Sequence, residues 1–204
     1  MKDQNNAMVI NQAPLDDVDM DAEGELAVAK ATVAMLRSRL SELERLADTD
    51  ALTPLLNRRA FFRELNRAIQ SNVRHGVSSA LLYIDMDGLK SINDARGHAT
   101  GDAAILHVAR YLRDHTRLTD LVARIGGDEF AIILTHVDDG LAAAKAKGLA
   151  EGLAATPLSF NHTPIHVTIG CGVTMIAGDD DAASALARAD TAMYASRLAE
   201  SGSN

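Results

Sequence analysis

Cysteine is nearly absent from this sequence, because Cys171 is the only one among its 204 residues. A single thiol cannot form a disulfide within the chain. Its apolar neighbours, which include Ile169 and Val173, favour a small buried side chain over a redox centre or a metal ligand.

The sequence also lacks any apolar run near the roughly 20 residues that a membrane-spanning helix requires. It does not open with the charged and then apolar pattern of a secretory leader. Together these absences predict a cytoplasmic protein without a membrane segment.

Positive charge is scarce, with 20 Lys and Arg residues against 28 Asp and Glu residues and a formal net charge of -8. Proteins that bind long nucleic acids cluster Lys and Arg, so this balance argues against a nucleic-acid partner. A nucleotide substrate of an acidic protein usually needs divalent cations beside its phosphates, which makes paired acids the feature to look for.

Composition divides the chain into three parts. Residues 1–23 carry a cluster of acids and few large apolar residues, which predicts a flexible acidic tail. Over 24–47, apolar residues recur at spacings of three and four, which favours a coiled-coil helix that pairs two copies of the chain. A single amphipathic helix packed on its own domain is the alternative. The predicted seam consists of Leu26, Ala29, Val33, Leu36, Leu40, Leu43 and Ala47.

Residues 48–204 form the globular part, in which amphipathic segments and short apolar runs alternate. Helices are expected near 58–72, 101–115, 140–154 and 182–199. Strands are expected near 80–84, 121–125, 130–134 and 165–173. Two of these runs flank Gly126 and Gly127, which predicts a hairpin. The two glycines permit positive φ at the turn and let the backbone approach a ligand closely.

Two acidic clusters follow these strands. The segment 85–90, Asp-Met-Asp-Gly-Leu-Lys, begins where a buried run turns outward, and Asp128 with Glu129 follows the Gly-Gly pair. An EF-hand calcium loop is excluded, because Leu89 and Lys90 replace a required oxygen ligand and a required glycine. Either cluster alone could be ordinary surface acids, but together they predict a metal site.

With these motifs the chain resembles the GGDEF-domain diguanylate cyclases, whose core string stands here as Gly126-Gly127-Asp128-Glu129-Phe130. The resemblance covers about residues 48–199. It implies an α+β, ferredoxin-like core with a mainly antiparallel sheet, and condensation of two GTP into cyclic di-GMP and two pyrophosphates. Further matching segments are Asp50–Thr53, Leu56–Arg59, Asp85–Lys90, Ile92–Asp94, Gly97–His98, Gly101–Asp102, Arg124, Ala189–Asp190 and Tyr194.

The resemblance implies a metal site at the acids. Asp85, the Met86 carbonyl, Asp128 and Glu129 would hold two Mg²⁺ or Mn²⁺ ions per active site. Asp128 and Glu129 would be the catalytic acids, with Asp128 as proton acceptor from a ribose 3′-hydroxyl.

It also implies substrate contacts. Asn93 and Asp102 would read the guanine edge, because their oxygens suit its N–H donors. A purely structural role is the alternative for these two and for His98. The implied contacts to phosphates and other parts of GTP are Gly88, Leu89, Lys90, His98, Gly126, Gly127 and Arg197.

A product-inhibition site is implied by the segment 117–120, in which Arg117 and Asp120 would bind cyclic di-GMP. An ordinary exposed ion pair is the alternative. A second Arg usually completes this site in the family, and only Lys145 or Lys147 stands near it here.

Four positions depart from the family pattern. Pro54 replaces a Gly and would stiffen the joint that follows the stalk. Arg197 replaces a phosphate-contacting Lys, and Ser201 stands where Arg is common, which together imply weaker phosphate binding. Gly170 replaces a frequent Ser, and the sequence offers no physical reason for it.

The implied reaction needs two opposed GTP-bearing domains, so it predicts a homodimer held by the coiled coil. Two alternatives to an enzyme are a non-catalytic cyclic di-GMP-binding module and an interaction protein whose GTP site never turns over. Intact Asp128 and Glu129 argue against the first, and the altered positions 197 and 201 support the second.

Overall fold

The computed structural model describes residues 22–201, and the chain divides into two compact units at residues 44 and 45. Residues 22–44 of helix α1 (Ala22–Asp48) make up the described part of the first unit. The helix includes Ala22 and Glu23, so it starts before the predicted boundary, and the rest of the predicted tail lies outside the described residues. Four predicted seam residues expose between 47% and 56% of their surface: Leu26, Val33, Leu36 and Leu40.

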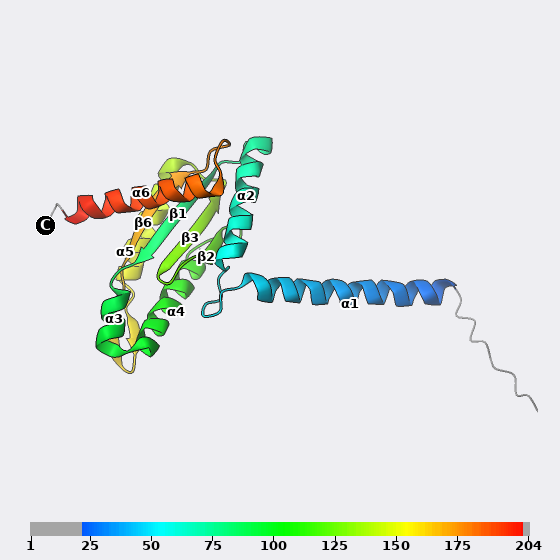
Figure 1. Ribbon diagram of the computed structural model, residues 1–204, viewed down its shortest axis with the longest axis horizontal. Helices are drawn as coiled ribbons and strands as arrows, with labels where there is room; N and C mark the ends of the chain where they lie inside the picture. Colours follow the sequence, from blue (N-terminus) through cyan, green and yellow to red (C-terminus); the bar gives the residue numbers. More distant parts are fainter. Residues whose placement is uncertain (1–21, 202–204) are drawn as a thin grey trace, which may run out of the picture. The chain divides into compact units, whose positions relative to one another are not determined.

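A four-stranded antiparallel sheet forms the centre of the second unit (Figure 1). Its strand order is β2-β3-β1-β6. This arrangement confirms the predicted α+β fold with a mainly antiparallel sheet. The strands are β1 (Ser79–Met86), β2 (Leu121–Arg124), β3 (Glu129–Thr135) and β6 (Ile169–Met175).

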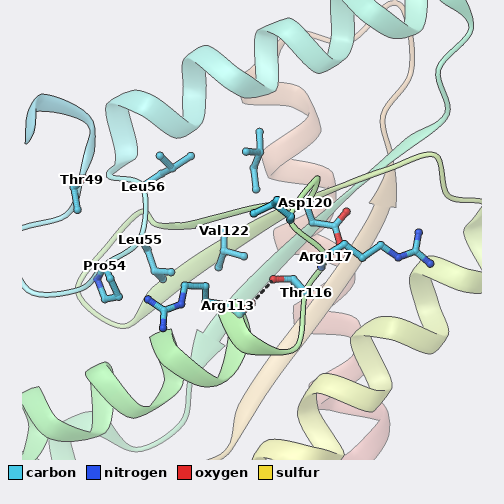
Figure 2. Close-up of a pocket in the computed structure, with 11 residues that line it drawn as sticks. Thr49, Pro54, Leu55, Leu56, Arg113, Thr116, Arg117, Asp120 and Val122 are labelled. Atoms are coloured by element: carbon cyan, nitrogen blue, oxygen red, sulfur yellow. Dashed lines mark hydrogen bonds between the residues drawn. The ribbon is translucent and has the colours of Figure 1, made fainter. Parts of the chain in front are cut away.

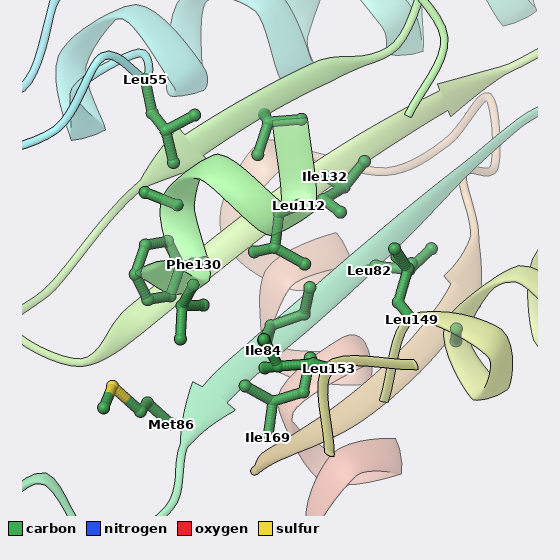
Figure 3. Close-up of a cluster of buried hydrophobic side chains, with 14 of the residues drawn as sticks. Leu55, Leu82, Ile84, Met86, Leu112, Phe130, Ile132, Leu149, Leu153 and Ile169 are labelled. Atoms are coloured by element: carbon green, nitrogen blue, oxygen red, sulfur yellow. The ribbon is translucent and has the colours of Figure 1, made fainter. Parts of the chain in front are cut away.

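Helices cover both faces of this sheet, which is why its central strand is an unbroken apolar run. Side chains alternate between the two faces along a strand. Leu82 and Ile84 of β1 pack with α4 (His98–Asp114) and α5 (Asp139–Ala154), as the cluster in Figure 3 shows. Leu81 and Tyr83 face α2 (Arg58–His75) and α6 (Ala182–Ser201).

Two expectations for the secondary structure are wrong. The segment 165–173 is not one strand: β5 (Thr163–Ile165) pairs with β4 (Leu158–Phe160) in a separate hairpin, and β6 begins at Ile169. Helix α3 (Leu89–Arg96) was not expected, because only Leu89 and Ile92 give its eight residues an apolar side. Its presence moves the start of α4 to His98, before the expected Gly101.

Cys171 has the environment that its apolar neighbours predict. It is partly buried on β6 and packs against the main apolar cluster. Burial raises the pKa of its thiol to about 12, so the thiol is protonated near neutral pH. Within residues 22–201, no helix combines the length and the apolar character that crossing a bilayer requires.

Candidate active site

The acids of the two predicted clusters meet at one end of the central strands. Asp85 on β1 is the direct cross-strand partner of Glu129 on β3. The Met86 N–H donates to the Asp128 carbonyl oxygen at 3.0 Å, which holds the hairpin tip against the end of β1. Asp85 precedes Asp128 and Glu129 by more than 40 positions in the sequence. The pairing of β1 with β3 nevertheless brings the three carboxylates to the same end of these two strands.

Protein groups already bind two of these carboxylates. The Tyr83 hydroxyl donates to Glu129 Oε1 at 2.5 Å, and Arg197 Nη2 donates to Asp85 Oδ1 at 2.7 Å. Burial raises the pKa of the Asp85 carboxyl, the Arg197 hydrogen bond opposes this shift, and the nearby charge of Asp128 adds to it. Burial and then the Glu129 hydrogen bond raise the pKa of Tyr83, so its hydroxyl stays a donor.

The oxygen ligands at this end of the strands suit a hard divalent cation, because Asp85, Asp128 and Glu129 all offer carboxylate oxygens. Among residues 22–201, however, no three His, Cys, Asp or Glu side chains are already gathered around one point. A cation at Asp85 would compete with the Arg197 hydrogen bond, and one at Glu129 with that of Tyr83.

The glycines of the hairpin tip make room for a neighbouring side chain. Neither Gly126 nor Gly127 has a positive φ, so this turn does not use the backbone freedom that two glycines permit. The Ile125 and Gly126 N–H groups both donate to the Glu129 carbonyl oxygen, at 2.9 and 3.3 Å. A Cβ at Gly126 would lie 1.9 Å from Glu129 Oε2. Gly126 therefore leaves room for the Glu129 carboxylate.

The predicted guanine contacts lie where α3 meets α4. Asn93 Oδ1 is buried and has no hydrogen-bond partner, and a Cβ at Gly101 would lie 1.9 Å from it. Leaving such an oxygen unpaired costs about 1–3 kcal/mol, so it is suited to a ligand that brings a donor. Asp102 follows Gly101 on α4 and is exposed, and His98 is exposed at the start of that helix.

The turn from β1 into α3 carries the predicted phosphate contacts. Gly88 adopts a left-handed conformation with a φ of 70° and precedes the first residue of α3, Leu89. Glycine takes this conformation without the Cβ strain of other residues. Lys90 is exposed in the first turn of the helix, which leaves its ammonium group accessible.

Arg117 and Asp120 form a tight turn between α4 and β2. The Arg117 N–H donates to Asp120 Oδ2 at 3.0 Å, and the Asp120 N–H donates to the Arg117 carbonyl oxygen at 3.0 Å. Within the described residues the two side chains form no ion pair with each other. The simple ion-pair alternative is therefore not what the structure shows.

Two cavities adjoin this turn. One, of about 630 Å³, is lined by Pro54 and Arg113 and also by Arg117 and Asp120. Figure 2 shows the Arg117 side chain directed away from Pro54 and Arg113. The other, of about 360 Å³, is lined by Arg117, Asp120 and Lys145. Lys145 therefore lies beside the predicted product site, and its ammonium group donates to the His115 carbonyl oxygen, whereas Lys147 pairs with Glu151.

A network that the sequence did not reveal joins the start of the globular part to the hairpin tip. Asp50 Oδ1 accepts hydrogen bonds from the Thr53 N–H and the Thr53 hydroxyl, both at 2.8 Å, and from Arg124 Nη1 at 3.3 Å. Arg124 Nη2 also donates to the Gly127 carbonyl oxygen at 2.7 Å. The turn before α2 is thereby connected to the Gly-Gly turn through one guanidinium group.

Tyr83 is a second residue that sequence reasoning missed. It looks like part of the buried run 80–84, but it is two residues before Asp85 and so points to the same face of the sheet. On an antiparallel pair this places it diagonally opposite Glu129. A hydroxyl within an otherwise apolar run, two positions before an acid, was the available signal.

Comparisons with known proteins identify the family of this chain. The family model described as diguanylate cyclase, GGDEF domain, matches residues 47–203. Diguanylate cyclase TpbB of Pseudomonas aeruginosa is 33% identical over 196 residues, which cover 94% of this chain and 44% of that protein. Diguanylate cyclase DgcP of the same species is 33% identical over 162 residues, which cover 79% of this chain and 24% of that protein. This chain thus spans less than half the length of these curated relatives.

Solved structures show the same fold. The coiled coil and GGDEF domain of DgcB from Caulobacter crescentus, in complex with cyclic di-GMP, matches with a TM-score of 0.76 and 32% identity, covering 87% of this chain and 94% of that one. Diguanylate cyclase SiaD from Pseudomonas aeruginosa, in complex with its activator SiaC, matches with a TM-score of 0.78 and 26% identity, covering 87% and 68%. The family model and these matches, together with the strand order and the acids at the end of the central strands, lead to one conclusion. This chain belongs to the GGDEF-domain diguanylate cyclase family.

Proposed function

We propose that this protein is a diguanylate cyclase that condenses two GTP molecules into cyclic di-GMP and two pyrophosphates across a homodimer. The observation that carries the proposal is the meeting of Asp85, Asp128 and Glu129 at the ends of two paired strands. GTP is a nucleotide of the cell interior, so the proposed reaction takes place in the cytoplasm.

The proposed chemistry forms two phosphodiester bonds. The ribose 3′-oxygen of one GTP attacks the α-phosphorus of the other, a P–O bond forms, and the bond to pyrophosphate breaks. Asp128 accepts the proton of the attacking hydroxyl. Two Mg²⁺ or Mn²⁺ ions held by Asp85, the Met86 carbonyl, Asp128 and Glu129 would offset the negative charge that develops.

Substrate positioning in this proposal uses both sides of the α3–α4 pair. The unpaired Asn93 Oδ1 and the Asp102 carboxylate accept hydrogen bonds from the amine and ring N–H of guanine. Adenine lacks that pair of donors, so GTP is selected over ATP. Lys90 and the backbone amides at Gly88 and Leu89 bind the β- and γ-phosphates, with His98 and the hairpin glycines close to the substrate.

The homodimer supplies the second half of the site. Each domain carries one GTP, and the two must face each other for the attack. Helix α1 exposes large apolar side chains that a second copy can cover. Joining two domains by a short stalk gives each an effective concentration on the order of millimolar for the other.

The direct test is incubation of the purified protein with GTP and Mg²⁺, with chromatographic separation of the products. We expect cyclic di-GMP and pyrophosphate from GTP, none from ATP, and loss of both when EDTA removes the metal. Intact GTP combined with tight binding of cyclic di-GMP would replace the cyclase proposal by a receptor. The Arg197 hydrogen bonds to the acids are the observation that would favour a domain that binds nucleotide without turning GTP over.

Product inhibition is the further part of this proposal. The turn at Arg117 and Asp120 with the neighbouring Lys145 offers a guanidinium, a carboxylate and an ammonium group around one cavity. Losing one good contact to guanine costs about 1–3 kcal/mol. The change Arg117→Ala should therefore raise the cyclic di-GMP concentration for half-maximal inhibition roughly tenfold or more, as measured from initial rates.

Two lysines of α5 provide a matched comparison for this prediction. Lys145→Ala should weaken inhibition because Lys145 lines the cavity, whereas Lys147→Ala should not, because Lys147 pairs with Glu151 outside it. Equal inhibition of the parent and the Arg117→Ala and Lys145→Ala variants would refute a product site at this turn.

A further inference from the structure

Gly170 lies where a side chain would collide with Arg197. It sits on β6 directly opposite Asp85 of β1. A Cβ built at Gly170 would lie 2.4 Å from Arg197 Nε and 2.8 Å from Arg197 Cζ. These distances are well inside van der Waals contact, so even alanine would push the guanidinium group away. The flexible Arg197 side chain, and not the sheet, would have to move.

In the space beside Gly170, the Arg197 guanidinium group contacts two acids. Arg197 Nη2 donates to Asp85 Oδ1 at 2.7 Å, to Asp87 Oδ1 at 2.5 Å and to the Asp85 carbonyl oxygen at 3.2 Å. The other oxygen of Asp87 accepts from the Thr168 hydroxyl at 2.8 Å, which fixes that carboxylate. Arg197 Nη2 thus links the carboxylates of Asp85 and Asp87 at the end of β1.

Negative charge gathers around the Arg197 contact. Asp85 and Asp87 share the Arg197 Nη2 group, and Asp128 lies beside the end of β1 because its carbonyl oxygen accepts the Met86 N–H, so three carboxylates lie near one another. Asp85 is 25% exposed and Arg197 33% exposed, so water screens the pair only in part. Charge-assisted hydrogen bonds of this kind are among the stronger ones in proteins. The guanidinium therefore offsets a repulsion that a divalent cation would otherwise offset.

We propose that Gly170 and Arg197 form an internal latch on the metal site, in which Arg197 takes the place of a cation on Asp85 and must leave before a divalent ion binds there. The inference rests on the proposed metal site. It assigns linked roles to two positions that depart from the family pattern: Arg197 is the competing cation, and Gly170 provides the space for it. A released Arg197 becomes available to the phosphates of an incoming GTP.

The latch makes metal binding in the absence of nucleotide weaker than the carboxylates alone would allow. We expect Gly170→Ala, which displaces the guanidinium, and Arg197→Gln, which removes its charge, each to tighten Mn²⁺ binding about tenfold. The measurement is a titration of the full chain with Mn²⁺ alone, following the electron paramagnetic resonance signal of free Mn²⁺. Thermal unfolding with and without Mn²⁺ should show a larger metal-induced rise in Tm for both variants.

Arg188→Gln is the matched control, because Arg188 lies on the same helix but pairs with Asp180. It removes the same charge and should leave the Mn²⁺ affinity unchanged. Equal affinity of the parent, Gly170→Ala and Arg197→Gln, or weaker binding by Arg197→Gln, would overturn the latch. Failure of the cyclase proposal is seen separately, as an absence of cyclic di-GMP from GTP in a protein whose latch variants do bind Mn²⁺ more tightly.

Discussion

A protein carrying both Asp128→Asn and Glu129→Gln is expected to form cyclic di-GMP at least about 10³-fold more slowly than the parent. The two changes keep the shape of the side chains but remove two negative charges and the proposed proton acceptor. Loss of metal ligands and of charge stabilisation typically costs several kcal/mol in the transition state. Gln at position 129 can still accept the Tyr83 hydrogen bond, so the fold should be retained.

The measurement is kcat at saturating GTP and Mg²⁺, with products separated by chromatography. A variant with Asp114→Asn and Glu151→Gln makes the same change in net charge at two exposed acids that are not part of the proposed site and should keep the parent rate. Parent-like turnover in the double variant at 128 and 129 would show that the reaction, if present, uses another site.

The second large effect is expected at the stalk. Replacing Leu36 and Leu40 by Asp should break the predicted coiled coil, because each side chain is 56% exposed on α1 and would face its copy in a dimer. At about micromolar protein, the rate should fall roughly 10²-fold, since the tethered partner is effectively at millimolar concentration. The rate per protein should then rise with protein concentration, as expected for an encounter between separate domains.

Sedimentation analysis together with activity at several protein concentrations tests this prediction. The control variant carries Ala31→Asp and Ser38→Asp, which add the same charges to α1 away from the predicted seam. It should remain a dimer and keep its activity. A demonstrated monomer with undiminished turnover would contradict the need for the stalk.

Apolar patterns over short stretches of the sequence predicted most of the helices and strands. The run 80–84 became the central strand β1, and the two runs around the Gly-Gly pair became the hairpin of β2 and β3. Helix α3 escaped prediction because its apolar residues are too few to show a period. The segment 165–173 was misread because strand pairing, and not local composition, decides where β5 ends and β6 begins.

The site was predicted at the level of residue types and not of contacts. The acids and Asn93 were named from motifs, and the structure brings Asp85 to Glu129 and leaves Asn93 Oδ1 unpaired. Tyr83 was missed because in the sequence it is one more member of a buried run. The space that Gly126 leaves for the Glu129 carboxylate was also not foreseen, because a turn glycine first suggests backbone freedom.

By itself the sequence determined most of the helices and strands, the acids at the ends of two strands, the apolar repeat of the stalk and the family. Each of these features can be recognised from residues that are close together in the sequence. Only the tertiary structure decided which group each acid meets. Arg197 reaches Asp85 across 112 positions because β6 pairs with β1 and α6 packs over both. Contacts between residues so far apart depend on strand register and helix packing, which cannot be inferred from a short stretch of sequence. For this reason only the tertiary structure explains Gly170, whose missing side chain leaves space for Arg197.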